Sequence, residues 1–263
     1  STADGNGSIT APFAEIQTAV DAAADGDVVR IAAGVYNAGA SVSSEGGGSF
    51  SRVHVDKRLK IVGVGRDETV IEGASDSGGV DGLGTAAVRC LLLGPGSNGS
   101  LVEKVSFRNG HTPAAGSAGD SGAGAWCAGG SGVTNYFVDC TFENCVGGGF
   151  GGAVRGGVLI RTLVDRCTSV TPNAGALYGT QGAYNCVFVA SGRYGATHAT
   201  SCPVVGLDTY GPFVNCTFVG NEGYGAQKIS NWAAIKIYNT LILAHVTVGV
   251  EQGADMAYSA TTI

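Results

Sequence analysis

The sequence predicts a parallel β-helix, a solenoid in which every coil of the chain stacks on the one before it. A short strand-like run recurs about every 20 to 30 residues. The runs centre on Cys140, Cys167, Cys186, Cys216 and, in the last instance, Thr240. A small glycine-containing pair follows each of these anchors roughly ten residues later. Glycine supplies 45 of the 263 residues and charged residues only 14%, which suits a turn-rich β fold.

The N-terminal segment carries helix signals instead of strand signals. In residues 11–24, Pro12 lies near the start, and Gly26 follows the end. Four side chains share one face at helical spacing: Phe13, Ile16, Val20 and Ala23. A helix across the open end of a first coil would cover its unpaired strand edge and its apolar core. We therefore expect residues 11–24 to form an N-terminal capping α-helix.

The coils are expected to fill the rest of the chain, from residue 28 to residue 263, so that residues 1–263 form one domain. Three Gly/Ser-rich segments, 41–51, 75–85 and 111–124, are predicted to be surface loops. Strand alternation at every second residue predicts inward-facing triplets around the anchors. These triplets are Val138, Cys140 and Phe142, then Tyr184, Cys186 and Phe188, then Val214, Cys216 and Phe218.

The four anchor cysteines are predicted to form one buried column of free thiols. Equivalent residues of adjacent coils lie about 4.8 Å apart, whereas a disulfide requires Cβ atoms about 3.8 Å apart. In such a column, Cys186→Ser should cost roughly 1–3 kcal/mol, because the new hydroxyl has little to bond. The sequence does not decide between thiols and disulfides for Cys90, Cys127, Cys145 and Cys202.

Composition and charge exclude several functions. The net charge is −6 and no cluster of lysine or arginine occurs, so no nucleic-acid partner is expected. The chain contains no run of about 20 apolar residues, so no membrane span is expected. The four histidines lie far apart in the sequence without metal-ligand spacing. Neither a metal nor another cofactor is therefore expected.

Two segments resemble a known family. The run 14–36, which begins Ala-Glu-Ile-Gln-Thr-Ala-Val-Asp, and the stretch 53–73 resemble the opening of secreted right-handed parallel β-helix proteins of the pectate-lyase-like superfamily. The later Asn-Cys-Thr-Phe and Gly-Gly-Ala units are similar to repeats of that superfamily and of polymorphic outer-membrane adhesins. The resemblance implies a right-handed coil and a secreted or cell-surface location. It leaves the activity open, because this superfamily includes lyases, hydrolases, epimerases, tailspikes and adhesins.

A row of polar side chains is the candidate functional surface. If Trp126, Val154 and Leu177 point inward, the residues around them point outward. The larger outward residues are then Cys127, Arg155, Tyr178, His198 and Lys228, of which the last four form a polar row. Beside it lies a floor of small residues, Ala125, Ala153, Ala176, Ala196 and Ala226. Such a row predicts a shallow groove for a chain-like anionic ligand, namely an acidic polysaccharide.

The residue types in this row suit β-elimination on a uronic-acid polymer. A base must remove the proton next to the carboxylate, and cations must offset the charge that develops there. His198 or Tyr178 could act as the catalytic base, while Arg155 and Lys228 bind carboxylates. The resemblance also suggests calcium-dependent lyases and aspartate-based hydrolases. Neither is expected, because the candidate carboxylates do not share equivalent positions: Asp139, Glu143, Asp165 and Glu222.

The sequence leaves a second interpretation open. The four polar residues could be unrelated solvated side chains, and the protein a non-catalytic structural, adhesive or self-assembling cell-surface β-helix. A further expectation concerns the C-terminal end, where 235–243 still reads as a repeat strand without a cap after it. This pattern predicts either end-to-end self-association or a further domain.

Overall fold

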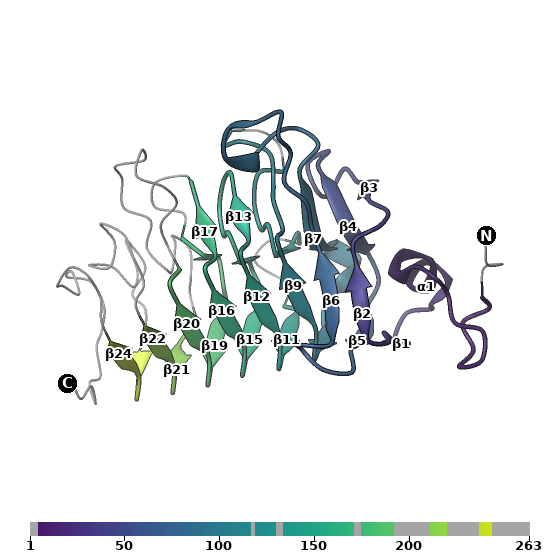
Figure 1. Ribbon diagram of the computed structural model, residues 1–263. Helices are drawn as coiled ribbons and strands as arrows, with labels where there is room; N and C mark the ends of the chain where they lie inside the picture. Colours follow the sequence, from purple (N-terminus) through teal and green to yellow (C-terminus); the bar gives the residue numbers. More distant parts are fainter. Residues whose placement is uncertain are drawn as a thin grey trace.

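The computed structural model describes residues 5–116, 119–129, 134–170, 175–191, 211–219 and 237–243. These residues form a right-handed parallel β-helix, which confirms the predicted fold class. The coils stack along one axis, with helix α1 (Ile16–Ala22) at the N-terminal end (Figure 1). Across the described ranges, no helix is both long and apolar enough to cross a membrane.

Each coil contributes one short strand to each of the long sheets. Sheet 1 contains, in spatial order, β1 (Val28–Arg30), β5 (Lys60–Val62), β8 (Leu101–Glu103), β11 (Tyr136–Val138), β15 (Val158–Ile160), β19 (Gly182–Tyr184), β21 (Phe213–Val214) and β23 (Ile237–Tyr238). Sheet 2 contains β2 (Gly34–Tyr36), β6 (Thr69–Glu72), β9 (Ser106–Arg108), β12 (Thr141–Glu143), β16 (Leu163–Asp165), β20 (Val187–Val189), β22 (Thr217–Val219) and β24 (Leu241–Leu243). Within the described residues, each of these two sheets contains eight strands, one from each coil.

Sheet 3 is shorter and carries the irregular connections. It contains β3 (Ser41–Val42), β4 (Phe50–Val55), β7 (Val88–Leu93), β10 (Ala125–Cys127), β14 (Val154–Arg155) and β18 (Leu177–Tyr178). All neighbours are parallel except β3 and β4, which form an antiparallel hairpin. The predicted loop 41–51 is therefore wrong at its two ends, which are strands. A further pair joins β13 (Val146–Gly147) to β17 (Thr168–Ser169), and the 3-10 turns are Val80–Gly82 and Pro95–Ser97.

A single residue makes the corner between sheets 1 and 2 in successive coils. This residue has a left-handed backbone, with φ between 45° and 58°. The corner residues are Lys104, Asp139, Arg161, Asn185, Asn215 and Asn239. Because a left-handed residue interrupts the strand alternation, the inward residue of the preceding strand shifts by one position. Phe137, Ala183 and Phe213 are therefore buried, and the predicted inward positions of Val138, Tyr184 and Val214 are wrong.

The core consists of inward side chains that stack from coil to coil. Phe107 and Phe142 of adjacent coils lie with ring centroids 4.8 Å apart and nearly parallel planes. Phe137 packs its edge against Phe142 at 5.4 Å. Phe188 and Phe218 repeat the stacked arrangement at 4.6 Å. This ladder confirms that Phe142, Phe188 and Phe218 face inward, as the alternation around the anchors predicts.

The buried cysteines form two columns instead of one. Cys140, Cys186 and Cys216 precede equivalent strands of sheet 2, and Thr162 and Thr240 occupy the same column. Cys167 lies instead after β16, in a second column with Cys145 and Ser191. The prediction of burial is confirmed, but the placement of Cys167 in the first column is wrong. The reason is a second left-handed corner, which follows sheet 2 at Asn144, Arg166 and Ala190 and brings another small buried position into the repeat.

All seven described cysteines are buried free thiols, which answers the open question for Cys90, Cys127 and Cys145. Burial raises the pKa of Cys140 to about 12, and burial raises the pKa of Cys127 to about 12. Both thiols therefore stay neutral at physiological pH. Cys202 lies outside the described residues.

The structure revises the expected effect of Cys186→Ser. The Cys186 thiol donates to the carbonyl of Tyr184 at 3.3 Å. In the same column, the hydroxyls of Thr162 and Thr240 donate to the carbonyl two residues earlier at 3.2 and 3.0 Å. A serine hydroxyl finds the same acceptor, so the loss in unfolding free energy should stay below about 1 kcal/mol. Chemical denaturation checks this value, with Cys186→Val as the control that fills the site but cannot donate. A serine variant that is destabilised as strongly as the valine variant would contradict the expectation.

The N-terminal helix covers the first coil but is shorter than predicted. It begins at Ile16 because Glu15 has an extended backbone, so Phe13 lies before the helix and Pro12 does not start it. Ile16 and Val20 are buried in the same core as the coils. The Gln17 carboxamide accepts from the His54 amide at 2.8 Å and donates to the His54 carbonyl at 3.0 Å. The helix therefore caps the part of β4 that β3 does not pair with, as well as the apolar core.

Candidate functional site

The outer face of sheet 3 carries a row of side chains, one from each coil. Strand register aligns His54 with Leu92, Leu92 with Trp126, Trp126 with Arg155, and Arg155 with Tyr178. Leu92 is fully buried although it lies outside the core, and Gly46 of the β3–β4 hairpin lies against it. The last three residues of the row are only partly buried. The accessible part of the row is therefore Trp126, Arg155 and Tyr178, which we call the aromatic row.

Arg155 lies among three aromatic rings. Its guanidinium carbon is 4.9 Å from the ring centre of Trp126, 5.7 Å from that of Tyr178 and 5.9 Å from that of Phe150. Phe150 comes from the connection before β14, and its ring lies 4.4 Å from that of Tyr178. A cation within about 6 Å of an aromatic ring centre is attracted by the ring's quadrupole. These contacts restrict where the cation of Arg155 can lie while one side stays open to solvent.

A second arginine, Arg89, contacts the Trp126 ring of the aromatic row. Arg89 of β7 is fully buried, and its guanidinium carbon lies 5.0 Å from the Trp126 ring centre. Its Nε and Nη2 donate to the carbonyls of Ser121, Gly122 and Gly119, and its Nη1 donates to hydroxyls of the β3–β4 hairpin. Burial lowers the pKa of Arg89 to about 9, which still leaves it protonated at neutral pH. Arg89 therefore ties the 119–122 segment and the hairpin to the sheet beside Trp126.

The predicted row is correct in part. Val154 and Leu177 point inward, and Arg155 and Tyr178 are neighbours on the outer face, as expected. The inward placement of Trp126 and the outward placement of Cys127 are wrong. Register pairs Ala125 with Val154, so Trp126 lies outside beside Arg155 and Cys127 is buried in the core. His198 and Lys228 lie outside the described residues.

The predicted alanine floor is also wrong where it is described. Ala125, Ala153 and Ala176 are fully buried in the core. Ala125 is inward because it pairs with Val154, and the other two immediately precede the inward residues of β14 and β18. A flat aromatic surface, which the sequence interpretation placed inside, takes the place of a floor of small residues. The available signal was the inward position that recurs in sheet 3, which is Val154 in β14 and Leu177 in β18. In β10 this position is Ala125, one residue before Trp126.

The carboxylates of sheet 2 form a separate arrangement. Glu143 and Asp165 are register partners, so the expectation that these carboxylates share no equivalent position is wrong. Arg166 contacts Glu143 at 2.6 Å and Asp165 at 2.8 Å. Burial raises the pKa of Asp165. Because Arg166 pairs with both carboxylates, this group holds the turn after β16 to the sheet. Within the described part of the chain, no set of three or more His, Cys, Asp or Glu side chains is arranged to hold a metal ion.

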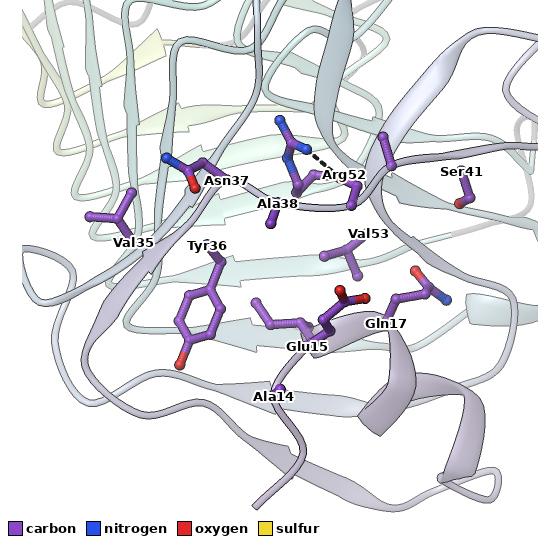
Figure 2. Close-up of a pocket in the computed structure, with 13 residues that line it drawn as sticks. Ala14, Glu15, Gln17, Val35, Tyr36, Asn37, Ala38, Ser41, Arg52 and Val53 are labelled. Atoms are coloured by element: carbon purple, nitrogen blue, oxygen red, sulfur yellow. Dashed lines mark hydrogen bonds between the residues drawn. The ribbon is translucent and has the colours of Figure 1, made fainter. Parts of the chain in front are cut away.

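A pocket of 360 Å³ lies between α1 and the first coils, as Figure 2 shows. Gln17 of the helix and Glu15 just before it line one side, and Tyr36 and Arg52 line it from sheets 2 and 3. Arg52 donates to the carbonyls of Glu72 and Gly39, and the Tyr36 hydroxyl donates to Ala32 at 3.1 Å. Gln17 is engaged with His54. Gln17 thus joins the cap to the coils, whereas Arg52 and Tyr36 bond within the coils, so we assign the pocket to the junction between the cap and the coils.

Comparison with known proteins shows the fold. No protein-family model matches the chain, and no curated protein matches it. Among solved structures, pectin methylesterase PemA from Erwinia chrysanthemi aligns with a TM-score of 0.51 and 12% identity, over 98% of this chain and 91% of that chain. Its fold is the right-handed parallel β-helix of the pectin-lyase-like superfamily.

Two further structures are similar at lower scores. Pectin methylesterase from carrot aligns with a TM-score of 0.45 and 16% identity, over 98% of this chain and 90% of that chain. Pectin methylesterase from Yersinia enterocolitica aligns with a TM-score of 0.43 and 14% identity, over 94% of this chain and 95% of that chain.

Proposed function

We propose that the outer face of sheet 3 binds an acidic polysaccharide lengthwise, with one sugar unit facing each coil. The observation that carries the proposal is the aromatic row itself: Trp126, Arg155 and Tyr178 stand side by side in consecutive coils, outward and partly exposed. Adjacent strands repeat at about 4.8 Å, so the row presents a regular series of contacts to a regular polymer.

The chemistry of the row matches a uronic-acid chain. The aromatic side chains offer flat apolar surfaces to the C–H faces of sugar rings, and Tyr and Trp also carry polar groups at the edge. Arg155 offers a planar set of donors that fits a carboxylate. Because three rings hold this guanidinium in place, binding orders few additional side chains. PemA is named for action on pectin, so pectic polymers are the first ligands to test.

β-elimination at this face is the catalytic part of the proposal. Tyr178 or His198 would remove the C5 proton next to the carboxylate, while Arg155 and Lys228 would hold carboxylates. A C4–C5 double bond would then form as the glycosidic C4–O bond breaks, and the leaving oxygen would take up a proton from the protonated base or from water. A rise in ultraviolet absorbance from unsaturated uronides on pectin, alginate or glycosaminoglycans tests the reaction. Binding without this product would leave a carbohydrate-binding protein and remove the lyase assignment. A protein of either kind works on extracellular polymers, so we also propose an extracellular location.

Two substitutions test the binding face. We expect Arg155→Ala and Trp126→Ala each to weaken polygalacturonate binding by about tenfold, equivalent to about 1.4 kcal/mol. The loss for Arg155→Ala should shrink as salt is raised, because exposed charges are screened within about 10 Å at 0.1 M salt. The loss for Trp126→Ala should change little with salt, because apolar contact is not screened. Isothermal titration calorimetry at two salt concentrations measures both effects.

The matched control is Arg58→Ala, which removes an exposed charge near the end of the cap helix. Arg58 pairs with Asp25 and lies outside the aromatic row. If Arg58→Ala weakens binding as much as Arg155→Ala, attraction to general positive charge explains the result and the proposed face is wrong.

A further inference from the structure

A groove separate from the aromatic row runs along the corner between sheets 1 and 2, with a volume of 670 Å³. The left-handed corner residues of four consecutive coils line it: Lys104, Asp139, Arg161 and Asn185. Arg66 joins them from the connection between β5 and β6. Each coil supplies one corner residue, so these side chains follow one another at the strand spacing of about 4.8 Å.

The charges in this groove are unbalanced. Arg161 forms a two-point ion pair with Asp139, with N–O distances of 2.7 and 2.8 Å. The hydrogen bonds from Arg161 lower the pKa of Asp139, and the nearby charges of Arg66 and Lys104 lower it further. Within the described residues, the side chains of Arg66 and Lys104 form neither an ion pair nor a hydrogen bond. Two exposed cations therefore remain uncompensated on a chain whose net charge is −6.

A ladder of asparagine side chains ends at the same groove. Asn239 donates to Asn215 at 2.7 Å, and Asn215 donates to Asn185 at 3.2 Å. The Nδ2 group of Asn185 has no acceptor among the described side chains. Arg161, the corner residue of the preceding coil, carries donors only and cannot accept from it. The groove therefore presents guanidinium, ammonium and amide donors, with one carboxylate that is already paired.

Two exposed apolar side chains complete the lining. Val64 and Val187 are 52% and 38% exposed, and both face the groove. A ligand that fits this surface carries anionic acceptors at regular spacing together with apolar C–H surface. A polymer of carboxylated sugars has both properties, whereas a simple inorganic anion has only the first.

We propose that the corner groove is a second binding track for a carboxylate-bearing glycan. The proposal rests on the proposed function, because both tracks take the same class of polymer. The two tracks lie on different sides of each coil, so one protein molecule can hold two polymer segments. Linked contacts of this kind raise the overall affinity for a long polymer without new contacts at either track.

Nuclear magnetic resonance with trigalacturonate as the probe tests the groove. We expect two separate groups of backbone amide shifts, one at Lys104, Asp139 and Arg161 and the other at Arg155 and Tyr178. The double substitution Arg66→Gln and Lys104→Gln should weaken the first group at least tenfold and leave the second unchanged. Arg155→Ala should weaken binding at the second group and leave the first group unchanged. Arg58→Gln, which removes an exposed charge elsewhere, should leave both groups unchanged.

The outcomes separate the two proposals. If only the corner amides respond, the corner track stands and the aromatic row is wrong. If only the row responds, or if Arg58→Gln weakens the corner as much as the double substitution does, the corner track is wrong. The last comparison replaces trigalacturonate with sulfate at matched ionic strength. Equal shifts and equal affinity with sulfate would also overturn the assignment to a glycan.

Discussion

Replacing Arg89 with methionine is expected to lower the free energy of unfolding by about 3–5 kcal/mol. Methionine fills much of the space but cannot donate, so the buried carbonyls of Gly119, Ser121 and Gly122 lose their partner. The hydroxyl of Ser51 loses the same donor. Each buried polar group left without a partner costs about 1–3 kcal/mol, so several such groups make a large effect. Chemical denaturation measures the change.

Two variants make this result interpretable. Arg58→Met applies the same chemical change to an exposed ion pair and should have an effect close to zero. Arg89→Lys keeps the charge but lacks the planar fork, so its stability should lie between those of wild type and Arg89→Met. Tryptophan emission should also change in Arg89→Met, because Arg89 lies against Trp126. If Arg89→Met is as stable as wild type, the hydrogen bonds around Arg89 do not hold these segments to the sheet.

Replacing Phe142 with alanine is expected to cost about 3–5 kcal/mol. Its ring is fully buried between the stacked ring of Phe107 and the edge of Phe137. Removal opens a cavity in the middle of the ladder, and parallel strands on both sides limit how far the coils can collapse into it. Because each coil contacts only its neighbours, the damage should weaken the coupling between the N-terminal and C-terminal coils.

The matched control is Phe150→Ala, which removes the same side chain from the partly exposed connection before β14. It should change stability little while it weakens polysaccharide binding, since Phe150 contacts Arg155 and Tyr178. Circular dichroism during chemical denaturation compares the two variants. Equal destabilisation by both would show that the phenylalanine ladder is not the main support of the coils.

The architecture could be predicted from the sequence because similar side chains stack on one another in successive coils. The same residue types therefore recur once per coil along the chain. Cys140, Phe142 and their equivalents had to be small or apolar in every coil, so they were visible as a period. The corners were harder to predict. A left-handed residue interrupts the two-residue alternation, and Lys104, Asp139 and Arg161 carry no shared residue type that marks it. The asparagine before Cys186, Cys216 and Thr240 was the available signal, since asparagine tolerates this conformation.

The candidate site was predicted less completely for a different reason. Arg155 and Tyr178 follow their small pairs at the same distance, so their adjacency was visible. Trp126 was misassigned because a tryptophan in an apolar run favours an inward position, whereas two arginines stabilise it outside. Arg89 was not identified at all. A lone charge within Val-Arg-Cys-Leu-Leu-Leu is the signal that a buried arginine leaves in such a strand.

The one-residue corner between sheets 1 and 2 also sets how such a protein can change its length. From one corner residue to the next, as from Asp139 to Arg161, the chain completes a closed circuit and returns to the same backbone conformation. A duplication or deletion that begins and ends at corner residues therefore adds or removes one circuit without redirecting the chain on either side. The solenoid can therefore lengthen in steps of about 4.8 Å, whereas a break that joins non-equivalent positions of two coils must rebuild a sheet.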